Sequence, residues 1–134
     1  MATIHHVAAW VCDLEAQRDF YLGLFGGTAT TVYRNQARGF RSCFLAFGAG
    51  ARLELMTVVG LAASPAQPAT GLAHLAFGAG TSADVDAFAR RLREAGRAVE
   101  NGPRRTGDGF YELVFRDPEG NLVEVVADAG DAGG

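Results

Sequence analysis

Two histidines and two glutamates lie inside apolar segments of this chain, at matching distances. His6 precedes Glu54 by 48 residues and His74 precedes Glu124 by 50, so the second pair repeats the first with a shift of 68 to 70. Glutamate is almost never fully buried unless it is paired or bound to a metal. A single such residue is most often a hydrogen-bonded core group. Four at matching positions of a repeat instead indicate one shared metal site.

The ligand set of that site would comprise two imidazoles and two carboxylates. Such a set suits Zn, Ni, Co, Mn or Fe(II) and is too rich in nitrogen for Ca or Mg. An octahedral ion held by four residues would keep two positions for water or substrate oxygens. It could polarise a carbonyl and stabilise an enediolate while a carboxylate takes the proton alpha to that carbonyl. The predicted chemistry is that of a metal-dependent lyase or isomerase.

The elements that must position these residues are predicted to occur in the same order twice. Asp13 can cap a first helix, which Gly26 and Gly27 end, and Thr81 with Asp84 forms a capping box for a second, which Gly96 ends. The strands expected in the first half are 4–11, 28–34, 41–48 and 51–58. Those expected in the second half are 72–78, 98–103, 110–116 and 121–127.

The fold prediction is therefore α+β, a tandem βαβββ repeat in one domain over residues 1–134. The repeats span about 4–58 and 72–127, with a proline-containing linker over 59–71 and a flexible tail over 128–134. A half of about 60 residues is marginal alone. We therefore expect the halves to share a curved, barrel-like mixed sheet around the metal site, within one chain or by exchange in a dimer.

Strand alternation predicts where the four side chains point. Residues two apart in a strand share a face, so His6 shares a face with Trp10 while its apolar neighbours turn towards the helix. Glu54, His74 and Glu124 likewise point away from apolar neighbours, towards a common cavity if the sheet curls. His5 competes with His6, but only His6 aligns with His74, so His5 is expected at the strand end or beside a ligand.

These motifs together resemble the vicinal oxygen chelate superfamily, which includes glyoxalase I, methylmalonyl-CoA epimerase, extradiol dioxygenases and fosfomycin-resistance proteins. The residues that carry the resemblance are His6-Val7, Val11, Asp13-Leu14, Phe20-Tyr21, Leu53-Glu54-Leu55, His74-Leu75-Ala76-Phe77 and Asp117-Pro118-Glu119-Gly120-Asn121-Leu122-Val123-Glu124. The resemblance implies metal ligands at His6, Glu54, His74 and Glu124, with Glu124 as proton-transfer base and Glu54 as a possible second base. It also implies a homodimer.

The complete ligand set separates activities within that superfamily. Extradiol dioxygenases and fosfomycin-modifying enzymes resemble a two-histidine, one-glutamate arrangement, and bleomycin-binding members lack the set, whereas four ligands are similar to bacterial glyoxalase I. Trp10 stands where glyoxalase I commonly has an arginine for the glutamyl carboxylate, and Val58 where it has an asparagine. We therefore expect a lyase or isomerase that does not act on a glutathione adduct. The alternatives are a non-catalytic binding or resistance protein and, third, an Fe(II) extradiol dioxygenase.

Substrate contacts are predicted less directly. Trp10 either forms an apolar wall for the substrate or fills the core. Arg104 and Arg105, like a second group at Arg34, Arg38 and Arg41, either bind an anionic substrate group or are solvated loop charges.

Composition bounds the partners and the compartment. The net charge of −3 gives no reason to expect nucleic acid or an anionic membrane as a partner, and no apolar run reaches membrane-helix length. Two cysteines without ligand spacing, Cys12 and Cys43, favour reduced thiols in the cytoplasm.

Overall fold

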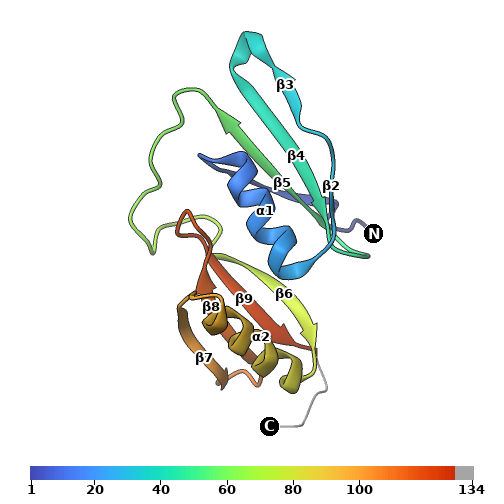
Figure 1. Cartoon of the computed structure of the whole chain (residues 1–134), viewed down its shortest axis with the longest axis vertical. Helices are drawn as coiled ribbons and strands as arrows, with labels where there is room; N and C mark the ends of the chain where they lie inside the picture. The colour runs from blue at the N-terminus through green and yellow to red at the C-terminus, as the bar shows by residue number, and fades with distance from the viewer. Residues whose placement is uncertain (129–134) are drawn as a thin grey trace. The chain divides into compact units, whose positions relative to one another are not determined.

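The computed structural model describes residues 1–128, and the chain divides into two compact units. Unit 1 is Met1–Pro65 and unit 2 is Ala66–Gly134, so the division falls inside the predicted linker. Each unit runs from a strand through a helix into further strands (Figure 1), which confirms the α+β class and the repeated order of elements. The tail predicted over 128–134 lies outside the described residues except for Asp128.

Unit 1 forms a mixed sheet with one helix. Its elements are β1 (His6–Trp10), α1 (Leu14–Phe25), β2 (Thr28–Ala29), β3 (Tyr33–Asn35), a 3₁₀ helix (Gln36–Arg38), β4 (Phe40–Ala46) and β5 (Arg52–Val58). The strand order is β1-β5-β4-β2, with β3 also paired to β4, and only β1 and β5 run parallel. The single strand predicted over 28–34 is interrupted because the Thr30 hydroxyl accepts the N–H of Phe44 at 2.9 Å in place of a backbone carbonyl.

Unit 2 repeats this arrangement with fewer strands. Its elements are β6 (His74–Gly80), α2 (Ser82–Glu94), β7 (Val99–Arg105), β8 (Tyr111–Arg116) and β9 (Leu122–Ala127), in the sheet order β6-β9-β8-β7. The predicted turn between β8 and β9 is present. The Asp117 carboxylate stabilises it by accepting the N–H groups of Glu119 and Asn121, each at 2.9 Å. This turn sets the register that places Glu124 on β9.

Neither sheet is closed into a barrel. In unit 1 β1 forms one edge and β2 and β3 form the other, and in unit 2 the edge strands are β6 and β7. Four or five strands are too few to close around a filled interior, for which about eight are usual. The barrel-like closure expected from the sequence is therefore not a property of either sheet taken by itself.

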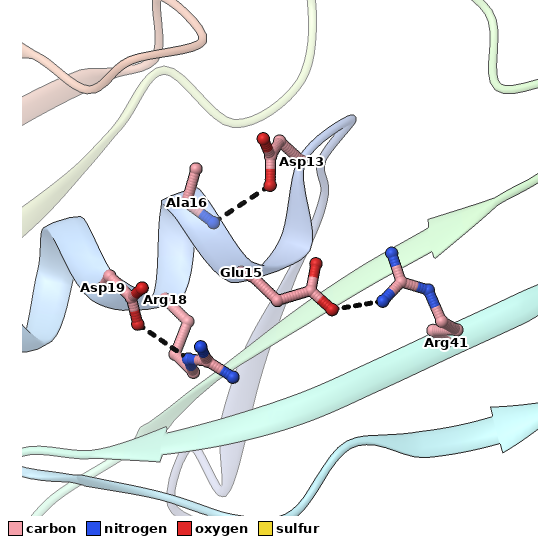
Figure 2. A network of polar contacts seen from close by, with 6 residues as sticks. All are labelled: Asp13, Glu15, Ala16, Arg18, Asp19 and Arg41. Carbon is pink, nitrogen blue, oxygen red and sulfur yellow. Dashed lines mark hydrogen bonds and ion pairs between the residues drawn. The ribbon is translucent and has the colours of Figure 1, made fainter.

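In unit 1 the helix covers one face of the sheet (Figure 1). The Asp13 carboxylate caps α1 by accepting the Ala16 N–H at 3.0 Å, and Glu15 forms an ion pair with Arg41 of β4 (Figure 2). The helix ends at Phe25, where Gly26 adopts a φ of 71° and donates to the Leu22 carbonyl. The buried apolar residues of α1 and the sheet it covers are Val11, Leu14, Phe20, Tyr21, Cys43, Leu45, Leu53 and Leu55.

In unit 2 the predicted capping box of α2 is confirmed, since Thr81 and Asp84 bond to each other's backbone N–H. The buried apolar residues between α2 and its sheet are Val85, Phe88, Ala89, Leu92, Leu113, Phe115, Val123, Val125 and Ala127. Tyr111 of β8 donates to Asp86 of α2 at 2.6 Å. Each helix is thus joined to its sheet by buried apolar side chains together with a polar contact between helix and strand.

Within residues 1–128 neither cysteine forms a disulfide; Cys12 is exposed and Cys43 is buried. Burial raises the pKa of the Cys43 thiol, because the thiolate would lose its hydration under α1. Among residues 1–128, neither helix is long and apolar enough to cross a bilayer.

Candidate metal centre

Each unit places its histidine and glutamate on two parallel strands in the same register. In unit 1 Ala8 of β1 lies opposite Glu54 of β5, and in unit 2 Ala76 of β6 lies opposite Glu124 of β9. His6 and His74 each precede that alanine by two residues. The histidine therefore lies diagonally across from the glutamate on the same sheet face in both units.

The four side chains lie on the face opposite the helix, here called the helix-free face. The neighbours of Glu54 and Glu124 on their own strands point to the helix side and are buried: Leu53, Leu55, Val123 and Val125. The glutamate side chains are only 16% and 17% exposed, although they do not enter the apolar core. The prediction that all four polar side chains turn away from the packed face is confirmed.

The structure brings the predicted ligands together in two pairs. His6 Nε2 lies 3.7 Å from Glu54 Oε1, and His74 Nε2 lies 3.2 Å from Glu124 Oε2. Among residues 1–128 no group of three or more histidine, cysteine, aspartate or glutamate side chains is arranged to hold a metal. Each unit thus supplies one half of the predicted ligand set.

His5 contacts His6 in the way expected of a residue beside a ligand. The two Nδ1 atoms lie 2.8 Å apart, so one ring donates and the other accepts. This leaves Nε2 of His6 directed at Glu54. A partner on the second ring nitrogen fixes the tautomer and orientation of a ligating histidine.

The glutamate of unit 1 lies beside an aromatic and a cationic group. Phe44 of β4 is directly opposite Glu54, and the His6 ring meets the Phe44 ring edge-on at 5.3 Å between centroids. The guanidinium carbon of Arg52 lies 4.4 Å from the centroid of the same ring. Phe44 therefore holds His6 and Arg52 around Glu54.

The glutamate of unit 2 lies beside a second carboxyl group that the motif search did not find. Glu112 of β8 shares the face of Glu124 and is hydrogen-bonded to it; partial burial and this bond raise the pKa of Glu112. The positive charge of Arg104, which lies opposite Glu112 on β7, partly offsets this effect because it lowers the pKa of Glu112. Strand alternation could have revealed Glu112, because Leu113 beside it is a core residue.

Arg104 and Arg105 lie at the end of β7, not in a loop, and point to opposite faces. Arg104 lies on the helix-free face and donates from Nε to Asn101 at 3.1 Å. Arg105 donates to the Gly109 carbonyl and lies over the Tyr111 ring, on the helix side. The bulge before Arg104 requires Gly102, which has a φ of 84° and whose Cβ would lie 2.6 Å from a backbone oxygen. Of the two arginines, Arg104 is the one on the face of Glu124.

Trp10 is on the helix-free face of unit 1, as expected, and half exposed. Its ring meets Phe40 edge-on at 6.2 Å, and Phe40 in turn contacts Tyr33 at 6.3 Å. The aromatic residues therefore form a surface and not a core. Arg41 faces the other way, towards Glu15.

The donor chemistry of both pairs fits a divalent transition metal. Each histidine presents Nε2 to a carboxylate oxygen, and no arginine among residues 1–128 forms an ion pair with Glu54 or Glu124. Carboxylates that are mostly covered and lack a permanent cation are suited to a metal ion. The residues present therefore fit the group that the sequence predicted.

Comparison with known proteins decides the family. Residues 3–125 match the sequence model of the Glyoxalase/Bleomycin resistance protein/Dioxygenase superfamily. The chain belongs to this superfamily. The resemblance inferred from the motifs is therefore confirmed over nearly the whole length.

Similar proteins within the superfamily include one curated relative and many solved structures. The uncharacterized protein YqjT of Bacillus subtilis (strain 168) is 29% identical over 133 residues, covering 92% of this chain and 98% of its own. The glyoxalase family protein of Enterococcus faecalis is 29% identical, with a TM-score of 0.75 over 92% of this chain and 95% of its own. The lactoylglutathione lyase of Agrobacterium tumefaciens is 26% identical, with a TM-score of 0.71 over 100% and 98%.

Proposed function

We propose that the chain is a divalent-metal-dependent lyase or isomerase of the glyoxalase I type. Its reaction is the removal of a proton alpha to a carbonyl of a small-molecule substrate. The observation that carries the proposal is the matched register of the two histidine–glutamate pairs, which gives two imidazoles and two carboxylates on helix-free faces. His6, Glu54, His74 and Glu124 would hold the ion, either within one chain or between two copies in a homodimer.

The residues of the chain would divide the work as follows. A divalent ion, when bound, would polarise the substrate carbonyl as a Lewis acid. The Glu124 carboxylate would accept the alpha proton and return it, with Glu54 as the equivalent base in unit 1. Glu112, hydrogen-bonded to Glu124, would keep that carboxylate oriented on its strand. His5 would fix the His6 ring through Nδ1.

The substrate is proposed to differ from a glutathione adduct. Trp10 stands where glyoxalase I commonly has an arginine that binds the glutamyl carboxylate of glutathione. Its indole ring is half exposed and lies beside Phe40. An aromatic surface binds a flat apolar group better than a charged peptide end. The similarity to a lactoylglutathione lyase supports the reaction class. The substrate is inferred from the residues of this chain and not from that similarity.

Metal analysis of the protein purified without added metal tests the proposal. We expect Zn, Ni, Co or Mn to be bound by the wild type, and bound much less by the Glu54→Gln/Glu124→Gln variant, because two carboxylate ligands are lost. Replacing Glu119, which lies in the β8–β9 turn, by Gln is the matched control and should keep the metal. A wild-type protein that takes up none of these ions on titration would refute the proposal and leave a binding protein as the function.

A further inference from the structure

Arg52 is an arginine beside the candidate metal centre whose guanidinium has no polar partner among residues 1–128. It stacks on Phe44 at 4.4 Å and takes part in none of the ion pairs or side-chain hydrogen bonds of those residues. Arg18, Arg41, Arg104, Arg105 and Arg116, in contrast, each bond an oxygen atom. A half-buried guanidinium that has no anionic partner within residues 1–128 is a candidate group for binding an anionic ligand.

The position of Arg52 relates it directly to the metal-binding pair of unit 1. It precedes Glu54 by two residues on β5, so both side chains rise from the same face, and it lies opposite His6 on β1. The Phe44 ring contacts both the imidazole ring of His6 and the guanidinium of Arg52. A divalent ion held by His6 and Glu54 would therefore share this face with a permanent positive charge.

Two cations on one face repel each other unless an anion lies between them. We propose that Arg52 binds a carboxylate of the substrate beside the metal held in part by His6 and Glu54; this inference rests on the proposed function. The planar guanidinium lies against Phe44, so its N–H edge remains available for the two parallel hydrogen bonds that a carboxylate accepts.

The same face also indicates how the substrate would lie. In unit 2 the residue opposite His74 is Leu122, so the position equivalent to Arg52 carries no charge. Beyond Glu54, β5 continues on this face with Met56, next to Trp10 on β1. The polarity thus falls from Arg52 to Trp10. The substrate class that fits is a carbonyl compound with a carboxylate at one end and a flat apolar group at the other.

Two metal-chelating probes test the role of Arg52 in the zinc-loaded protein. Acetohydroxamate binds a metal alone, whereas succinic monohydroxamate adds a carboxylate. We expect Arg52→Leu, which copies Leu122, to weaken succinic monohydroxamate about tenfold or more in calorimetry and to leave acetohydroxamate within about twofold. Arg34→Leu, on the other face of the unit 1 sheet, is the control and should change neither. Equal losses for both probes, or no loss for either, would overturn the inference.

A second measurement keeps the inference testable if the proposed function fails and the wild type binds no metal. The Nε–H signal of Arg52, assigned by its absence in Arg52→Leu, is followed by NMR while succinate or inorganic phosphate is added to the metal-free protein. A saturable shift that is stronger with succinate supports a carboxylate site. A stronger response to phosphate overturns the carboxylate assignment, and no response to either overturns the site.

Discussion

The two units place a histidine and a glutamate in identical register but surround them with different groups. Around Glu54 lie the aromatic ring of Phe44 and the free guanidinium of Arg52. Around Glu124 the corresponding positions hold Val114 and Leu122, and the second carboxyl group of Glu112 is hydrogen-bonded to the glutamate. The backbone repeat therefore preserves the histidine–glutamate pair, while the charged groups around that pair differ between the units.

This difference in charge and aromatic content indicates that the two copies of the supersecondary unit are suited to different roles in the proposed reaction. The first unit gathers positive charge and aromatic surface on its helix-free face, which is suited to hold a substrate. The second gathers carboxyl groups, which are suited to move a proton. The register of the paired parallel strands keeps both pairs on the helix-free face, because a slip by one residue would turn each of these side chains into the core.

The largest difference that we expect between the units lies in their cores. Cys43 and Leu113 hold equivalent places, opposite Leu55 and Val125, and both are fully buried. Leu113→Ala should lower the free energy of unfolding by about 2–5 kcal/mol, since it leaves a cavity. Cys43→Ala removes only one atom and should cost roughly 1 kcal/mol. Urea unfolding followed by circular dichroism measures both, and equal losses would contradict the equivalence of the two positions.

The second largest difference that we expect concerns metal affinity, which replacement of the two predicted ligand glutamates should lower to different extents. Glu54→Gln leaves no other carboxylate on the helix-free face of unit 1 within residues 1–65. Glu124→Gln leaves Glu112, which can take its place. We expect Glu54→Gln to weaken metal binding by more than the roughly 10–100-fold that loss of an outer partner costs, and Glu124→Gln to weaken it less.

The variant Glu112→Gln/Glu124→Gln is the matched control for that comparison. It should lose as much metal affinity as Glu54→Gln, because unit 2 then has no substitute carboxylate. Competition with a chromophoric chelator measures all three variants. A larger loss in Glu124→Gln than in Glu54→Gln would reverse the comparison and show that Glu112 does not substitute.

Period-two alternation, the internal repeat and the capping residues were sufficient to predict the order of the elements, both helices with their N-caps, and the helix-free face on which the four predicted ligands lie. They could not predict what lies across a strand pair. Arg52 does not stand out in these patterns, because its importance comes from Phe44, eight residues earlier on the neighbouring antiparallel strand β4. Likewise, the Thr30 hydroxyl that interrupts the second strand acts on a distant backbone N–H. Such contacts depend on register, which local patterns do not encode.

His5 provides a smaller contrast, because Ala73 holds the equivalent place in unit 2. Its ring bonds Nδ1 of His6 at 2.8 Å, whereas His74 follows a residue with no polar side chain. We expect His5→Ala to weaken metal binding by roughly 10–100-fold, as loss of an outer partner usually does. Ala73→Ser is the control and should have no effect. Calorimetry measures the metal affinity of both variants. An unchanged affinity in His5→Ala would show that His6 needs no orienting partner.

The smallest contrast lies in how each helix is joined to its sheet. Arg41 and Tyr111 lie three residues before Phe44 and Val114 and contact Glu15 of α1 and Asp86 of α2 (Figure 2 shows the first contact). The hydrogen bond from Arg41 lowers the pKa of Glu15 from its ordinary 4.5. That from Tyr111 to Asp86 raises the pKa of Tyr111 from its ordinary 10.0.

These two shifts give the contacts opposite pH dependence. The Glu15 contact stabilises the fold above pH 4.5 and is lost as the pH falls through the lowered pKa, whereas the Tyr111 contact stabilises it below pH 10.0 and is lost as the pH rises through the raised pKa. Glu15→Gln should therefore cost under about 1 kcal/mol at pH 7 and nothing in acid, because both side chains of the pair remain partly exposed to solvent. Tyr111→Phe should cost about 0.5–1.5 kcal/mol at pH 7 and progressively less in alkali. Unfolding free energies at acidic, neutral and alkaline pH measure both variants; a cost of Tyr111→Phe that stayed constant in alkali would contradict the role of the phenol proton in the contact.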